Sequence, residues 1–265
     1  MSGAEIGVFG GSGFYSFLEG AEEVAVDTPY GPPSDRFVIG QVGGRSVAFV
    51  PRHGRRHHLP PHAIPYRANL WAMRELGVRR VIGPCASGSL SRDLPPGAFV
   101  VCDQFVDRTG GRDHTFYDGP VTTHVSAADP YCADLRSILV GTGREQGLDI
   151  RDGGTVVVVQ GPRFSTRAES RWYAGMGWGV INMTAYPEGW LARELGMCYA
   201  NVSLITDYDV GLDDDPAVEP VSHESVVQVF AANNDRLRRL LFDAIPRIGD
   251  QPDDVCRNAL TGARL

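Results

Sequence analysis

The sequence contains no lysine, so all 25 of its Lys-plus-Arg residues are arginines. This absence excludes a Walker-type phosphate loop, an enzyme that forms a Schiff base with its substrate, and any lysine nucleophile. If the protein binds a phosphate group, arginine side chains, backbone amides and hydroxyl groups must hold it.

Other features that define function classes are also missing. The chain has no basic tract or heptad repeat, and its net charge is −7, so nucleic acid is not an expected partner. No apolar run approaches the roughly 20 residues that cross a bilayer, so we expect no membrane partner. The opening stretch, MSGAEIGVFGGSG, has no basic region and no cleavage pattern. We therefore expect no secretory signal and a cytoplasmic protein.

The five cysteines are scattered, odd in number and without C-x-x-C spacing. We expect reduced thiols, and neither a disulfide framework nor a zinc site. Four of the seven histidines fall in the loop 51–62, together with three arginines. Prolines break any helical His-x-x-x-His spacing there, so a solvated basic loop or an anion clamp at Arg52 and His53 is preferred to a metal cluster.

The 265 residues fit one α/β domain with a C-terminal tail at 249–265. No linker or repeat divides the chain, and strand-like and helical segments alternate. The expected fold is therefore a mixed central β-sheet flanked by helices. Apolar and β-branched runs predict strands at 5–9, 37–39, 45–50, 79–82, 99–102, 155–159, 180–184 and 198–209. Helical spacing predicts helices at 66–76, 133–145, 166–173, 187–195 and 222–242.

Two acids stand at the end of the run CYANVSLITDYD, at positions 198–209. If the strand continues to its end, Asp207 and Asp209 point the same way, because side chains at i and i+2 share a face. Two like charges kept together need something to bind. A heterocycle that carries both an amine and a ring nitrogen needing a proton suits such a pair, although a solvated loop with surface acids is the simpler interpretation.

Small-residue and polar loops follow several strands. Gly10 to Gly13 forms a glycine turn in which Ser12 adds a hydroxyl donor, and such a turn lets an anion approach backbone amides. We expect the stretch 83–90, GPCASGSL, to be a second loop of this kind.

Nine segments in this order resemble the methylthioadenosine phosphorylases, trimeric members of the purine nucleoside phosphorylase family. They cover about residues 6–248, and they are GGSG, DTPYGPPSD, RHGRRH, YRANLWAM, CDQFVDRT, FYDG, QGPRFSTRAES, INMTAYPE and TDYD.

The resemblance implies phosphorolysis, in which inorganic phosphate attacks C1′ of a purine nucleoside and releases the base. It implies a nucleoside and phosphate as small-molecule partners, a homotrimer, phosphate as co-substrate, and no metal or organic cofactor. Asp207 and Asp209 would receive the purine, and Asp207 would donate a proton to it. Phe164 would contact the substrate and Met183 the ribose. Phosphate would be held by Ser12, Arg52, His53, Cys85, Ala86 and Thr184.

Specificity within the family is expected from a few positions. Relatives that act on 6-oxopurines tend to carry Asn and Glu where this chain has Asp207 and Ser165, so a 6-aminopurine is favoured. His223 stands where a small apolar residue usually meets the methylthio group, which predicts adenosine cleavage beside that of methylthioadenosine. His223 can also be interpreted as an ordinary polar helix residue. His124 aligns with a residue that reaches into a neighbouring subunit's 5′ pocket.

Two residues depart from the family's pattern. Cys85 replaces a Thr that often donates to phosphate, and Gln160 replaces a Glu. Because of these departures, a nucleoside-binding protein that has lost catalysis is retained as a rival hypothesis. A phosphorylase for 6-oxopurine nucleosides or methylthioinosine, and a hydrolase, are two further hypotheses.

Overall fold

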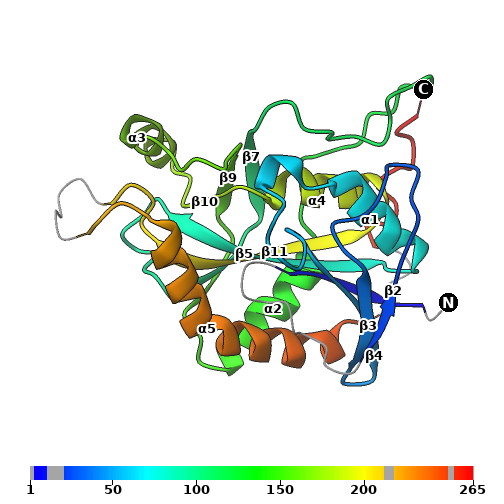
Figure 1. Cartoon of the computed structure of the whole chain (residues 1–265), viewed down its shortest axis with the longest axis horizontal. Helices are drawn as coiled ribbons and strands as arrows, with labels where there is room; N and C mark the ends of the chain where they lie inside the picture. The colour runs from blue at the N-terminus through cyan, green and yellow to red at the C-terminus, as the bar shows by residue number, and fades with distance from the viewer. Residues whose placement is uncertain (1–2, 11–20, 212–217, 250–253, 265) are drawn as a thin grey trace.

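The apolar runs form the middle of one mixed sheet in the computed structural model, which describes residues 3–10, 21–211, 218–249 and 254–264 (Figure 1). Within these residues the sheet has eleven strands. They are β1 Ile6–Gly10, β2 Glu22–Val24, β3 Phe37–Val42, β4 Arg45–Pro51, β5 Arg80–Ser89, β6 Phe99–Val101, β7 Gln104–Arg108, β8 Ile150–Asp152, β9 Thr155–Val159, β10 Val180–Asn182 and β11 Cys198–Asp207. The expectation of a mixed sheet flanked by helices is confirmed.

Two pairs of helices form layers on the two faces of the sheet, while α3 lies apart beside β9 and β10 (Figure 1). α2 and α5 cover one face, while α1 and α4 cover the other. Their bounds are α1 Tyr66–Glu75, α2 Ala133–Glu145, α3 Arg167–Gly175, α4 Ala185–Glu194 and α5 His223–Ala244, with short 3₁₀ turns η1 Pro61–Ala63 and η2 Ile245–Arg247. None of the described helices is long and apolar enough to span a membrane.

Capping residues explain where two helices begin. Thr166 accepts a hydrogen bond from the Glu169 amide, and the Glu169 carboxylate accepts one from the Thr166 amide. Ser222 caps α5 through Ser225. Each reciprocal pair satisfies amides that an open helix end leaves without partners.

The strand order places β5 at the centre, with β1, β10 and β11 as its neighbours. β11 runs parallel to β5 over nearly its whole length, from the Cys198–Arg80 pair to the Asp207–Gly88 pair. The expected loop at 83–90 is therefore wrong up to Ser89: its small residues continue the strand. They look like a loop because glycine and proline usually end strands, but partners on β11 outweigh that preference here.

Three strands are not predicted from the sequence. β2 and β8 are only three residues long, and β7 carries the polar residues of QFVDR. β7 is held by five residue pairs with β9. Pairing with a buried strand, and not its own composition, determines its structure.

Candidate active site

A pocket of about 230 Å³ opens where strands part beside β5. β1 pairs with the start of β5, at Arg80–Ile82, and β10 pairs with its end, at Gly88 and Ser89. The stretch between them has β11 on one side and no paired strand on the other among the described residues. Clefts of this kind, where strands diverge from a common neighbour, are frequent ligand sites in α/β sheets.

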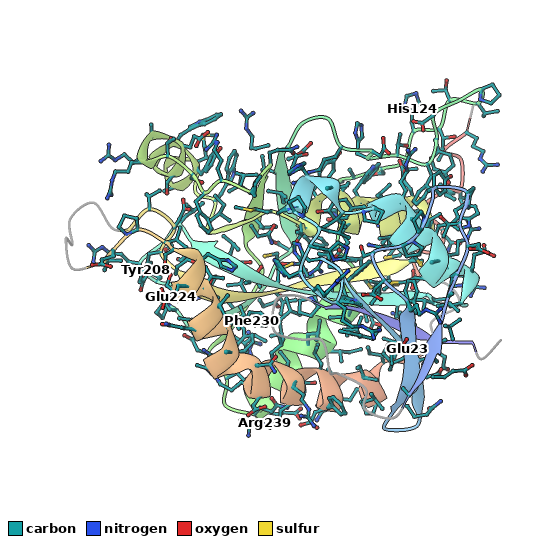
Figure 2. All side chains as sticks on the ribbon, viewed as in Figure 1. Glu23, His124, Tyr208, Glu224, Phe230 and Arg239 are labelled. Atoms are coloured by element: carbon teal, nitrogen blue, oxygen red, sulfur yellow. The ribbon has the colours of Figure 1, made fainter. Side chains whose placement is uncertain are left out.

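Most of the residues predicted from the sequence line this pocket. They are Arg52, His53, Cys85, Ala86, Phe164, Ser165, Met183, Thr184, Asp207, Asp209 and His223. Ser12 lies outside the described residues. His124 lies at the opposite end of the molecule from Tyr208, which separates the two acids (Figure 2). One subunit therefore brings eleven of the thirteen predicted residues together.

The two acids reach the pocket by a different route from the predicted one. β11 ends at Asp207, and Asp209 has left-handed backbone geometry with φ of 51°. The Asp209 amide donates to Asp207 Oδ1 at 2.8 Å. The two acids therefore lie on an Asx turn, which the Asp207 side chain closes. The prediction that the strand extends to Asp209 is wrong, because this Asx turn is tighter than the pleat.

The two carboxyl groups have different surroundings. Burial raises the pKa of Asp207, but its two oxygens accept hydrogen bonds from the Thr206 hydroxyl at 2.6 Å and from the Asp209 amide, which favour the charged form. Burial raises the pKa of Asp209 to about 6, the Ser170 hydroxyl opposes this, and the Asp207 charge adds to it. Asp209 Oδ2 is buried and has no hydrogen-bond partner among the described residues. Asp209 therefore releases its proton at a higher pH than an exposed aspartate does.

Gly88 makes room for the acid pair. A Cβ at this position would stand 2.9 Å from Asp207 Oδ1 and 3.5 Å from Asp209 Cβ. The same Cβ would also stand 2.9 Å from Cγ2 of Ile181, on the neighbouring strand β10. A glycine within a strand often marks a close approach, and here it is the acids that come close.

Arg52 follows β4 and is completely enclosed. Its Nε and Nη2 donate to the two Glu188 oxygens at 2.6 and 2.7 Å, and its Nη1 donates to the carbonyls of Gly10 and Pro84. Since a guanidinium has five N–H groups, the second N–H on Nη2 is left without an acceptor among the described residues. Burial lowers the pKa of Arg52, but the charge of Glu188 and its hydrogen bonds to Arg52, together with smaller contributions, outweigh burial and hold the pKa well above its ordinary value.

His53 and Cys85 bring little charge to the pocket. Burial lowers the pKa of His53 to about 3, and its Nδ1 lies 2.8 Å from the Leu59 carbonyl. A carbonyl only accepts, so Nδ1 carries the proton and Nε2 is an acceptor. Burial raises the pKa of the Cys85 thiol, which lies 3.3 Å from Thr184 Oγ1.

Sequence reasoning missed several lining residues. His57 stacks on His53 with ring centroids 4.4 Å apart, and it faces His223 at 6.5 Å. Its positive φ of 51° is unusual outside glycine, but a sequence does not display it. Pro61, Ser87, Asn182, Thr206 and Val226 also line the pocket. The histidine-rich loop was the one available signal for this group.

Arg112 fixes the loops around the pocket without lining it. Its Nη1 donates to the carbonyls of Met183 and Tyr186, at 3.0 and 2.7 Å. Its Nη2 and Nε donate to the backbone and side-chain oxygens of Gln160. Gln160 is thus a structural acceptor in this arrangement, a role that its amide oxygen and its backbone carbonyl fill.

No metal-binding group is found at this pocket among the described residues: the candidate trio of metal-ligating side chains, Cys132, Cys198 and Cys256, lies elsewhere. The pocket instead combines a pair of acids, hydroxyl groups, an arginine edge and three imidazoles. Such a set can bind an anion on one side and a hydrogen-bonding heterocycle on the other.

Comparison with known proteins identifies the family. The model of the phosphorylase superfamily matches residues 5–246. The chain belongs to the phosphorylase superfamily. A protein of Streptomyces coelicolor named purine nucleoside phosphorylase is 55% identical, over 98% of this chain and 95% of its own. A Thermofilum pendens S-methyl-5′-thioadenosine phosphorylase is 49% identical over the full length of both chains. The expected family, and with it the expectation of an enzyme of the pentosyltransferase type, is confirmed.

A solved structure agrees with the fold of this phosphorylase. An adenosine/methylthioadenosine phosphorylase variant from Schistosoma mansoni, in complex with adenine, superposes with a TM-score of 0.91 at 34% identity. The match covers 98% of this chain and 99% of the other. The relationship therefore extends over the whole α/β domain and does not depend on short motifs.

The raised pKa of Asp209 predicts a pH-dependent stability. Its native pKa of about 6 exceeds the ordinary 3.8, so the folded protein keeps a proton that the unfolded chain releases between these values. Stability is therefore lost as pH rises through this window, by about 3 kcal/mol at most. Asp209→Asn should remove this loss, becoming more stable than the wild type above pH of about 6 but not near pH of about 4.

Denaturant unfolding of the ligand-free protein between these pH values measures the difference. Asp235→Asn, on the exposed side of α5, is the matched control and should follow the wild type. A constant offset between Asp209→Asn and the wild type at all pH values would contradict a shifted carboxyl group.

Proposed function

We propose that this phosphorylase cleaves S-methyl-5′-thioadenosine with inorganic phosphate, giving adenine and 5-methylthioribose 1-phosphate. The observation that carries the proposal is the Asp207–Asp209 pair, in which Asp207 is half-buried and Asp209 is buried, and which shares a pocket with Arg52 and Thr184. Relatives that bear the name of this activity, and the adenine complex of the Schistosoma enzyme, support it.

The base end of the pocket suits a 6-aminopurine. The departing purine is an anion unless N7 is protonated, and Asp207 is the proposed proton donor. Asp209 accepts a hydrogen bond from the 6-amino group through Oδ2, the buried oxygen without a partner among the described residues. Burial raises the pKa of Asp207, which is the direction that favours a proton donor. Phe164 and Met183 are proposed to contact the base and the ribose, and Ser165, near Asp209, to favour the amino group.

The opposite end suits a phosphate ion as co-substrate, with no metal or organic cofactor. Thr184 precedes α4 and its hydroxyl faces Cys85, while the Ala86 amide and the remaining Arg52 N–H supply further donors. Ser12 is proposed to complete this set. A dianion beneath C1′ stabilises the oxocarbenium-like sugar that forms as the base leaves. His53 Nε2, an acceptor in the neutral ring, suits a ribose hydroxyl or a protonated phosphate oxygen.

Cleavage of 6-oxopurine nucleosides is the second candidate. The 55% identical Streptomyces protein bears the name purine nucleoside phosphorylase, which does not specify the 6-substituent. A charged Asp209 opposite a 6-oxo group places two acceptors against each other, which is repulsive. A protonated Asp209 removes that repulsion, so measured specificity must decide between the candidates.

Activity against a substrate panel tests the proposal. Methylthioadenosine should be cleaved faster than inosine, guanosine and methylthioinosine, and only with phosphate present. Asp207→Ala should reduce kcat/KM by about 10²–10⁴-fold, because it removes the acid. Phosphate should still raise the thermal midpoint of the Asp207→Ala variant, because this substitution leaves the phosphate end of the pocket intact. Base release without phosphate would instead indicate a hydrolase, and preference for inosine would favour the second candidate.

The third corner of the pocket faces the 5′ substituent in this proposal. It is formed by His57 and His223 together with the apolar Val226. Burial lowers the pKa of His57, with His223 adding to the effect, so that neutral ring offers one donor and one acceptor. Imidazole can hydrogen-bond a 5′-hydroxyl, whereas Val226 suits a methylthio group. We therefore propose that adenosine is an additional substrate.

His223→Ala should separate the two substrates. Losing one hydrogen bond costs about 0.5–1.5 kcal/mol, so kcat/KM for adenosine should fall by up to about tenfold. The value for methylthioadenosine should change far less. Glu224→Ala is the matched control because it is the next residue of α5 and does not line the pocket (Figure 2). An equal fall for both substrates would contradict a role of His223 in reading the 5′ group.

We propose a homotrimer in which His124 completes a neighbour's 5′ pocket. His124 lies near the C-terminus, remote from its own pocket (Figure 2). Its amide donates to the Ala263 carbonyl at 2.8 Å, and Thr123 forms a bridge with Arg264. The tail therefore supports the segment that carries His124, which is the arrangement that a residue acting across an interface needs.

Mixed trimers test this role. Co-expressed His124→Ala and Asp207→Ala subunits should recover activity, since about a quarter of the sites then pair an intact Asp207 with a neighbour's intact His124. Activity per site after tandem-tag purification, compared with each single variant, is the measurement. A mixture no more active than the mean of the two homotrimers would contradict it.

A further inference from the structure

A cluster of buried thiols lies outside the pocket. Cys132, Cys198 and Cys256 come from sites far apart in the sequence, yet their sulfur atoms all lie within 4.8 Å of one another. All three side chains are buried and are free thiols. Sequence spacing excluded a zinc site because it shows only neighbours along the chain, whereas this cluster is assembled by the fold.

Each thiol belongs to a different element. Cys132 occupies the N-cap position of α2 without a side-chain capping bond, and its amide donates to the Tyr199 carbonyl at 2.9 Å. Cys198 is the first residue of β11, and Cys256 lies in the tail that follows residue 253. The N-terminus of α2, with its positive end of the helix dipole, favours a thiolate at Cys132.

A carboxylate completes the set of four donors. Cys198 Sγ lies 2.7 Å from Asp254 Oδ2, two residues before Cys256. Asp254 is held in place because its Oδ1 accepts from the Arg257 amide at 2.8 Å. Three sulfurs and one carboxylate oxygen are ligands that Zn²⁺ takes in tetrahedral sites.

Two buried arginines surround the cluster. Arg80 is paired with Cys198 across the sheet, and its side chain is 5% exposed. Its Nη2 has no hydrogen-bond partner among the described residues and lies 3.8 Å from Asp254 Oδ2. Arg193 Nη1 lies 4.0 Å from Cys256 Sγ. Arg80 Nη1 also donates to Asp134 Oδ2 at 2.9 Å, so Arg80 serves this carboxylate and the cluster together. Positive charge beside the sulfur atoms favours thiolates over neutral thiols.

We propose that Cys132, Cys198, Cys256 and Asp254 form a structural zinc site that fastens the C-terminal tail to α2 and β11. Three thiolates, one carboxylate and Zn²⁺ sum to a charge of about −2, which Arg193 and Arg80 offset in part, since Arg80 is shared with Asp134. Arg80 and Arg193 would act as outer partners that orient and stabilise the charged ligands. Four protein ligands leave no open coordination position, so the site is structural and not catalytic.

Metal content of the full-length, untagged protein tests the proposal. Protein purified without chelators should contain about one zinc per chain by elemental analysis. Replacing zinc by Co²⁺ should give a near-ultraviolet thiolate-to-cobalt charge-transfer band, typical of sulfur ligation. Cys256→Ser should reduce the affinity for zinc by about tenfold or more, and it should lower the thermal midpoint. Cys102→Ser, another buried cysteine outside the cluster, is the control and should keep both.

Metal-free but folded protein would overturn the proposal, as would a disulfide between two of the three cysteines. Intact mass after alkylation under non-reducing conditions detects the disulfide directly. Should Cys256→Ser fail to fold, Asp254→Asn provides the second variant: it keeps the three sulfurs, and weaker zinc retention against a chelator is then expected. Unchanged retention in that variant would remove Asp254 from the site.

Discussion

The buried ion pair between Arg52 and Glu188 is the constraint on which the rest of the site depends. The arginine is 1% exposed and the glutamate is fully buried, and two short hydrogen bonds join them. Tyr199 donates a third bond to Glu188 at 2.7 Å. A buried pair of this kind stabilises little compared with an apolar one, but breaking it costs about 3–5 kcal/mol because a charge is left alone. The pair therefore fixes position more than it adds stability.

That pair joins the elements that meet at the pocket. Arg52 follows β4 and bonds the carbonyl of Gly10, where β1 ends, and that of Pro84 in β5. Glu188 lies on α4, whose start places Thr184. Gly83 shows how tight this arrangement is, because a Cβ there would stand 1.9 Å from the Tyr199 hydroxyl oxygen. Arg52 lines the pocket, but Glu188 already balances its positive charge. Its attraction for anions in the pocket is therefore weaker than that of an unpaired arginine.

The sequence predicts the helices and the apolar strands well, since burial imposes a period that composition displays. Prediction fails where pairing with a neighbouring strand determines the structure. β7 has a polar sequence, and the residues from Gly83 to Ser89 resemble a loop, yet both segments are strands. The two predicted acids do line one pocket, but they reach it by a different route from the predicted one. Strand alternation places both acids on one face, whereas the structure uses a bulge before Asp207 and a left-handed Asp209. Arg112 and Glu188 give no local signal, because their partners are distant in the sequence.

β11 connects the two chemically distinct parts of the molecule. It begins at Cys198, in the sulfur cluster, and ends at Asp207, in the pocket, about 30 Å away for ten extended residues. Its register with β5 is fixed pair by pair, because a one-residue slip would turn every buried side chain to the opposite face. The pairing with β5 therefore sets the depth at which Asp207 enters the pocket. The tail contacts the start of this strand, where Asp254 Oδ2 lies 2.7 Å from Cys198 Sγ, and its residues 254–264 do not line the pocket.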